Sequence, residues 1–424
     1  METNEISAKQ YKRTLAVIWF TIFVDLLGFG ILIPVIPLLL GDPTSKYYLI
    51  GGRYSVTQGF IMLGYLSAMW ALFVFLAAPI FGQLSDKYGR KKILLFALTG
   101  TSLSYVLFAI GIITRNLPLL FISRAFDGVT GSSIAAAQAA IADITRPENR
   151  AKNFGLIGAA FGLGFILGPY LGGKFSDPNL VSWFNATTPF WLAAILSFLT
   201  VLFILFFFKE TLIKKNSALK ITLARAFANI VKAARLSSMR SILLTNFLFQ
   251  GGFAFFTTFF SVILIRKFAF NQGNIGDFFS YLGLWVVLAQ VLILRLVLKK
   301  FHECQILNFS LLGLSIFMFL QLFPDKSWQL LLLTPFFAVS NGLAQANITA
   351  VVSRSASDNI QGEILGINSS IQSLAMAIPS ILSGYLAASF QPEASVLVAA
   401  IMIFFGWLVF YKGYGRQIKC DWQG

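Results

Sequence analysis

The chain has 424 residues, of which 57% are hydrophobic and only 12% are charged. Because a soluble domain carries about 25% charged residues, this composition excludes an ordinary soluble protein and predicts an integral membrane protein. The net charge of +16 would indicate nucleic-acid binding in a soluble chain, but here the cations fall mainly in tails and connections between apolar segments. Those segments are too long and continuous for the alternating strands of a barrel, so we predict an all-α helical bundle.

Apolar runs of the length that crosses a bilayer recur along the whole chain. An even number of crossings places both ends on one side, and the basic tails predict that this side is the cytoplasm. The sequence therefore predicts twelve transmembrane helices with both termini cytoplasmic. The expected spans are 15–40, 57–81, 92–113, 118–142, 153–174, 186–208, 241–265, 277–298, 305–323, 328–351, 363–387 and 393–412.

The longest polar segment, 209–240, separates the sixth span from the seventh. It carries eight cations and one acid, Glu210. Within it, Leu223, Phe227, Ile230 and Val231 share one helical face, which predicts a basic amphipathic helix on the inner leaflet. We therefore predict two six-helix halves, 1–208 and 241–424, joined by this cytoplasmic linker.

A short polar stretch interrupts the apolar tract between the second and third spans. It reads Gly82-Gln-Leu-Ser-Asp86-Lys-Tyr-Gly89-Arg90-Lys91-Lys92. The two glycines permit a tight turn, and short basic loops stay on the cytoplasmic side. Asp86 is an acid retained among four cations, which indicates a specific partner.

Asp25 lies about halfway along the first span. A charged side chain at this depth costs several kcal/mol, so an embedded acid is a functional hypothesis by default. Removal from water favours the neutral form of a carboxylate, and Asp25 is therefore predicted to load and release a proton. An acid held in an internal ion pair is the structural alternative.

Two more embedded charges, Arg124 and Asp127, stand three residues apart in the fourth span and share a helical face. An arginine keeps its charge, so its predicted role is to bias the protonation of Asp25 or Asp127. Gln138 follows Asp127 by about three turns and extends a polar stripe that is typical of a substrate path. A fixed Arg124–Asp127 pair that only stabilises the span is the alternative.

Uncharged amides recur at a spacing of four in the spans of the second half. Each pair places two polar side chains on one helical face, where they either hydrogen-bond between helices or line a cavity. With the many aromatic residues of the chain, such a cavity would suit amphipathic ligands. The predicted cavity residues are Asn246, Gln250, Asn341, Gln345, Asn368 and Gln372.

Span five carries small residues at a spacing that allows close helix contact: Gly158, Gly162, Gly164, Gly168, Gly172 and Gly173, with Pro169 among them. This segment resembles the antiporter signature of the major facilitator superfamily. The 82–92 stretch resembles the signature of the same superfamily between its second and third spans. Ile141-Ala-Asp143, Arg124 to Gly128, Lys209-Glu210-Thr211 and Gln361 to Gly366 extend the similarity.

Together these segments look like the twelve-span drug:proton antiporters, and most of all like the tetracycline-resistance efflux pumps. The resemblance implies the major facilitator fold, in which the two six-helix halves are pseudo-symmetric. The resemblance implies that Asp86 sits at the N-terminal end of span eleven, where the helix dipole favours an anion, and that Arg90 pairs with Asp143. The expected cytoplasmic gate comprises Gly82, Asp86, Gly89, Arg90, Lys91 and Asp143. Where those pumps have an acid in Ser-Leu-Asp-Tyr, this chain reads Ser102-Leu103-Ser104-Tyr105.

The resulting prediction is a secondary active transporter of the bacterial inner membrane that exports a small amphipathic molecule or drug in exchange for protons. A proton-coupled importer of a nutrient, or an exporter of a specific metabolite or siderophore, is the alternative on the same fold. We expect no enzymatic activity, no metal site, no nucleic-acid partner and no cofactor other than the coupling proton. Membrane lipids are the expected surroundings of a monomer.

Overall fold

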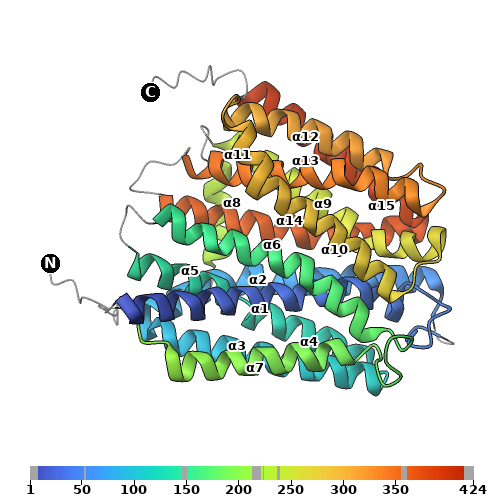
Figure 1. The fold of residues 1–424 in the computed structure, drawn as a ribbon, viewed down its shortest axis with the longest axis horizontal. Helices are drawn as coiled ribbons and strands as arrows, with labels where there is room; N and C mark the ends of the chain where they lie inside the picture. The colour runs from blue at the N-terminus through green and yellow to red at the C-terminus, as the bar shows by residue number, and fades with distance from the viewer. Residues whose placement is uncertain are drawn as a thin grey trace.

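The computed structural model of the chain describes residues 8–51, 54–145, 150–212, 221–222, 224–235, 239–354 and 361–414. In these ranges the regular structure is helical throughout, without strands. Figure 1 shows the long helices side by side with their axes roughly aligned, while the short α8 crosses behind them. We call the end of the bundle where α1 begins the terminal end, and the other the far end.

The first half of the chain forms seven helices, the fourth span being divided in two. They are α1 (Ala8–Leu40), α2 (Val56–Tyr88), α3 (Arg90–Ile113), α4 (Leu117–Thr130), α5 (Ser133–Ile144), α6 (Arg150–Ser176) and α7 (Thr188–Phe207).

The linker helix is α8 (Arg225–Arg235), and the second half follows it. Its elements are α9 (Arg240–Phe268), α10 (Gln272–Leu288), the π-helix η2 (Ala289–Ile293), α11 (Leu294–Val297), α12 (Glu303–Leu320), α13 (Ser327–Arg354), α14 (Gln361–Ser389), α15 (Pro392–Val409) and the π-helix η3 (Phe410–Tyr414).

The twelve predicted spans all fall on helices. Within the described ranges, nine helices are long and apolar enough to cross a membrane. The pair α4–α5, α6 and α13 lie outside that group and complete the bundle. The all-helical fold is therefore confirmed, while the division into domains at 208 and 241 stays a prediction.

The connection between the second and third spans is shorter than predicted. Gly82 lies inside α2, which continues to Tyr88, and the turn to α3 is Gly89 alone. Gly89 has φ 107°, a backbone conformation that L side chains rarely adopt. One glycine thus suffices for the reversal that we had assigned to a longer loop.

The fourth span is broken at Gly131–Ser132. Gly131, Ser132 and Ser133 follow one another, and all three have lower helix propensity than alanine. Ser132 Oγ bonds the carbonyl of Gly128 at 3.2 Å, which offers the backbone an alternative to the regular ladder. Asp127 and Gln138 therefore lie on different helices, and the continuous polar stripe predicted between them is absent.

The described core residues fall into three clusters. One consists of second-half residues from Met239 to Phe410, and another of first-half residues from Val17 to Phe208. The third is mainly first-half but includes Phe259, Val262 and Ala387. The halves pack on each other through α2 against α14, α6 against α10 and α1 against α9.

The linker helix α8 packs on both halves. The ring of Phe227 contacts Phe75 of α2 edge-on, with centroids 5.4 Å apart. Asn229 Nδ2 donates to Ser370 Oγ of α14 at 3.1 Å, and Ile230 packs on the second-half core. The predicted amphipathic helix is present, but part of its apolar face lies on protein and not on lipid. Leu223 lies outside the described residues.

Candidate functional site

Asp25 lies near the middle of α1, against the first residue of α5. The hydroxyl of Ser133 donates a hydrogen bond to Asp25 Oδ2. Because Ser133 begins α5, the carboxylate also faces a helix N-terminus, which favours its anionic form. The other oxygen, Oδ1, is buried and has no hydrogen-bond partner among the described residues, which favours the neutral form. These opposing influences suit a carboxyl that changes its protonation state.

The predicted Arg124–Asp127 pair is present and buried. Arg124 Nη1 donates to Asp127 Oδ2 at 2.6 Å, and the two side chains are only 4% and 5% exposed. Ser104 Oγ donates to Asp127 Oδ1 at 3.2 Å. The residue that replaces the acid of the Ser-Leu-Asp-Tyr pattern therefore stabilises Asp127. The Nε of Arg124 is buried without a partner in the described part of the chain.

Two neighbouring cavities surround these charges. The larger, of about 70 Å³, lies between the halves and is lined from α1, α2, α4, α9 and α14, with Arg124, Thr257 and Ser380 among its polar groups. The smaller, of about 20 Å³, lies within the first half and is lined by Asp25 and Asp127. That volume is about the size of one water molecule. The two acids predicted to carry protons thus share one small cavity.

The predicted substrate-cavity amides bond to each other across helices. Asn246 Nδ2 donates to Asn368 Oδ1 at 2.6 Å, and Gln250 Nε2 donates to Gln345 Oε1 at 3.3 Å. Asn341 keeps a buried Oδ1 without a described partner. None of these, nor Gln372 or the exposed Gln138, lines either of the two cavities. Their part in substrate binding stays a prediction.

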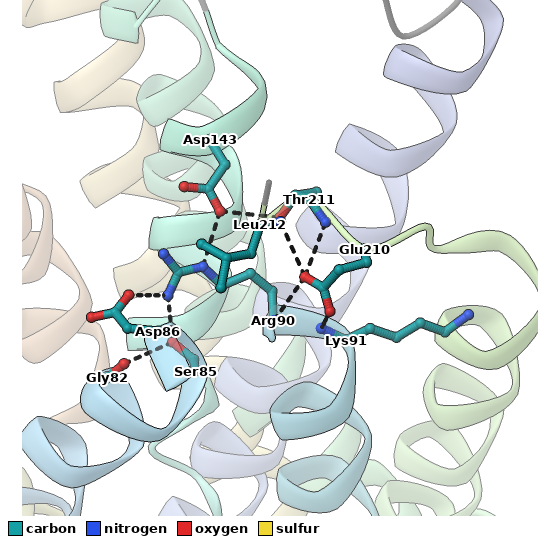
Figure 2. Close-up of polar contacts among 9 residues, drawn as sticks. All are labelled: Gly82, Ser85, Asp86, Arg90, Lys91, Asp143, Glu210, Thr211 and Leu212. Atoms are coloured by element: carbon teal, nitrogen blue, oxygen red, sulfur yellow. Dashed lines mark hydrogen bonds and ion pairs between the residues drawn. The ribbon is translucent and has the colours of Figure 1, made fainter. Parts of the chain in front are cut away.

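Arg90 organises a charge cluster at the terminal end (Figure 2). Its Nε donates to Asp143 Oδ2 at 2.9 Å, as predicted, and its Nη1 lies 2.6 Å from Asp86 Oδ1. Ser85 Oγ accepts a further bond from Nη1 at 2.6 Å. The Arg90 side chain is 7% exposed, so three acceptors surround a nearly buried cation. Asp86 therefore has a partner on α3. The resemblance placed Asp86 beside the start of α14, but the first side chains of α14 are not among the residues that the structure describes.

Glu210 closes this cluster from the chain that follows α7. Its Oε1 accepts from the backbone N–H of Arg90 at 2.9 Å, and its Oε2 from that of Lys91 at 3.2 Å. A carboxylate on the first N–H groups of a helix satisfies donors that have no partner within the helix. Thr211 Oγ1 adds a bond to Asp143 Oδ2 at 3.2 Å. In the sequence, Glu210 stands out as the one acid of the linker and as part of a resemblance, but neither feature predicted this role.

At the far end, polar contacts cross between the halves. The hydroxyls of Tyr65 on α2 and Tyr385 on α14 are 2.8 Å apart. Lys174 Nζ on α6 lies 2.7 Å from Asp277 Oδ2 on α10. Each of these four residues directly follows a glycine in the sequence, and the two glycines that belong to each pair also face each other across the halves. A Cβ added to Gly64 would lie 2.9 Å from the Cα of Gly384.

The glycines of α6 allow the close contacts that their spacing predicted. Cβ atoms at Gly168 and at Gly173 would lie 2.8 Å and 2.9 Å from the Cα atoms of Gly30 and Gly276. The same helix thus approaches α1 on one side and α10 on the other. Gly164 and Gly172 also lie against α1, and α6 is continuous through Pro169. The side chains of residues 150–159 are outside the described ones.

Comparison with known proteins places these features in a family. The model of the Major Facilitator Superfamily matches residues 18–378 and 242–419. The class H tetracycline resistance protein of Pasteurella multocida is 30% identical over 377 residues, covering 88% of this chain and 89% of that protein. Multidrug resistance protein 2 of Bacillus subtilis (strain 168) is 27% identical over 383 residues, covering 90% of each.

Solved structures agree on the fold. A human organic anion transporter superposes with a TM-score of 0.71 at 23% identity, covering 94% of this chain and 99% of that one. A D-xylose–proton symporter gives 0.73 at 15% identity, covering 94% and 97%. The chain belongs to the Major Facilitator Superfamily, and it is a membrane transporter.

Proposed function

We propose that this transporter exports small amphipathic molecules in exchange for protons, and that Asp25 carries the proton. The observation that carries the proposal is the contact set of Asp25: one oxygen on Ser133 at a helix N-terminus and one oxygen buried without a described partner. The Arg124–Asp127 pair shares the small cavity through Asp127 and biases the charge on Asp25. Tetracycline and multidrug resistance proteins among the relatives support a drug-like substrate.

The larger cavity supports an amphipathic ligand. Its wall combines aromatic rings and aliphatic side chains with the hydroxyls of Ser67, Thr257 and Thr258. Sites for small molecules are typically apolar with a few placed polar groups, and occupy about 300–1,000 Å³. A cavity of about 70 Å³ is smaller than that, so the halves must move apart to admit a drug-sized ligand.

We further propose that the terminal end faces the cytoplasm of a bacterial inner membrane. The basic residues Lys87, Lys91 and Lys92 at this end, and the basic α8, support that orientation. In this conformation the far end is then closed toward the outside by the contacts between the halves. Export requires these contacts to open while the terminal end closes, as in alternating access.

The test is proton flux in proteoliposomes that contain the purified protein and an internal pH dye. Addition of tetracycline or another lipophilic drug should release protons with wild type and not with Asp25→Asn, since the amide keeps the shape but cannot exchange a proton. Asp325→Asn is the matched control, because Asp325 has a side chain that is 89% exposed at the far end. Equal drug-induced flux with Asp25→Asn would refute the proposed role of Asp25.

A further inference from the structure

The two cavities meet at a wall made of two aromatic residues. The larger is lined by residues of both halves, and the smaller by first-half residues that include both embedded acids. Phe29 of α1 and Trp70 of α2 line both cavities. Their rings are in contact, with centroids 5.1 Å apart and planes inclined by 44°. The pair therefore separates the space between the halves from the space beside the carboxylates.

Gly128 of α4 and Gly131 directly after it leave room for Trp70 at this place. A Cβ on Gly128 would lie 2.6 Å from the carbonyl oxygen of Trp70, and a Cβ on Gly131 would lie 3.2 Å from its indole Nε1. Both distances are shorter than ordinary van der Waals contact. Because glycine stands at both positions, α2 and the indole approach α4 closely, next to Asp127.

One ion pair crosses the wall. Arg124 lines the larger cavity, its partner Asp127 lines the smaller, and the two side chains are 2.6 Å apart. A molecule in the larger cavity thus touches Arg124 and the aromatic pair, but among the described lining residues it meets no acid. Phe29, Trp70 and Arg124 are the lining residues that connect such a molecule directly to the surroundings of the carboxylates.

We propose that Phe29 and Trp70 form a coupling partition between a substrate compartment and a proton compartment. This inference rests on the proposed function and adds positioning residues to it. With the partition closed, Asp127 and the Oδ1 atom of Asp25 are buried and shielded from water between the halves. A ligand that fills the larger cavity displaces the rings, and the opened wall gives the carboxyl of Asp25 a path to release its proton into that space.

Chemical access to the smaller cavity tests the partition directly. Cys304 and Cys420 are first replaced by serine, since these are the two cysteines of the chain. Thr101→Cys then reports on the smaller cavity and Thr257→Cys on the larger, because each residue lines one of them. The rate of labelling by a small water-soluble thiol reagent is measured for both reporters with Trp70, Trp70→Phe and Trp70→Ala.

We expect Trp70→Ala to accelerate labelling of Thr101→Cys and to leave Thr257→Cys unchanged. If the native wall is open in a minor state of at most about 10%, removal of the indole should raise the rate by about tenfold or more. Trp70→Phe keeps a ring in the wall and should stay close to the wild-type rate. Phe29→Ala opens the same wall from α1 and serves if Trp70→Ala does not fold.

Equal labelling rates of Thr101→Cys with Trp70, Trp70→Phe and Trp70→Ala would overturn the partition. A rate increase with Trp70→Phe as large as that with Trp70→Ala would also overturn it. A second measurement tests its coupling role: without drug, an imposed pH gradient should decay faster in Trp70→Ala than in wild type, and an unchanged decay would overturn that role. The labelling rates do not require proton transport. Accelerated labelling together with absent drug-induced flux in wild type would therefore refute the proposed function and leave the partition standing.

Discussion

The two ends of the bundle are stabilised in different ways. At the terminal end, Arg90 joins α2, α3 and α5 of the first half to the start of the linker, where Glu210 lies. At the far end, Tyr65–Tyr385 and Lys174–Asp277 join one half to the other. The first arrangement keeps several helices of one half together as a unit. The second marks surfaces that have to separate when the far end opens.

Removal of Arg90 should have the largest effect on stability. Arg90→Ala leaves the partly buried Asp143 and the buried Ser85 without their cationic donor, and breaking a buried ion pair from one side costs about 3–5 kcal/mol. Because Asp143 is 22% exposed and Asp86 is 50% exposed, we expect the lower end of that range. Thermal unfolding in detergent measures the loss.

The control for this prediction is Lys92→Ala. Lys92 also carries a positive charge in the first turn of α3, but it is exposed. Surface substitutions usually change stability by less than about 0.5 kcal/mol. If the two variants unfolded at the same temperature, net charge and not the Arg90 cluster would stabilise the terminal end.

Alanine substitution of two helical glycines, one at each end of the bundle, compares the two ends directly. A Cβ on Gly173 would lie 2.9 Å from the Cα of Gly276 in the other half, whereas a Cβ on Gly82 would meet nothing within 4 Å. Gly173→Ala should therefore weaken closure of the far end by about 1–3 kcal/mol, the usual cost of overpacking. Gly82→Ala should be neutral or stabilise α2 by up to about 1 kcal/mol through helix propensity.

Spin labels at Val56→Cys and Gln391→Cys, in a chain without native cysteines, would report the open fraction of the far end. Both positions are exposed near that end, on α2 and just before α15. Gly173→Ala should increase the long-distance population and Gly82→Ala should not. The opposite result would mean that the close approach of α6 and α10 does not control closure.

Much of this organisation followed from the sequence because it rests on composition and short spacing. Apolar length predicted the spans, and a separation of three residues predicted the Arg124–Asp127 pair. The Arg90–Asp143 pair came from a resemblance and not from spacing, since 53 residues separate the two along the chain. Embedded charge alone indicated Asp25 as a functional residue.

Contacts between distant segments could not be predicted in the same way. Ser133, which follows the helix break at Gly131–Ser132, bonds Asp25 from 108 residues away, and Glu210 caps α3 from 120 residues away. Phe29 and Trp70 are two aromatic residues in a chain with 45 Phe and 8 Trp, so composition could not distinguish them from the others. The run Gly131-Ser132-Ser133 is the local feature of the sequence that indicates the helix break.

The ion pair at the far end should have a smaller effect than the glycine contact. Lys174 and Asp277 have side chains that are 25% and 49% exposed, and exposed pairs contribute about 0.2–1 kcal/mol. Lys174→Ala should raise the open-to-closed ratio by up to about fivefold, and the exchange Lys174→Asp with Asp277→Lys should restore it. High salt should reduce the difference. If Lys174→Ala raised the open-to-closed ratio equally in a chain in which Asp277 is already replaced, the ion pair would be excluded as the cause.

The hydroxyl contact of Tyr65 and Tyr385 should have the smallest effect. Tyr65→Phe keeps the edge-on ring contact, with centroids 6.0 Å apart, and removes one hydrogen bond. Both residues are exposed, so water can replace the lost partner, and the cost should lie near the lower limit of about 0.5 kcal/mol for a hydrogen bond. The spin-label ratio should then change by about twofold. Because the two hydroxyls share one bond, adding Tyr385→Phe should cause no further change. An additive second effect would show that each hydroxyl has a separate partner, and that the far end is closed by the glycine contacts and the Lys174–Asp277 pair without the tyrosine bond.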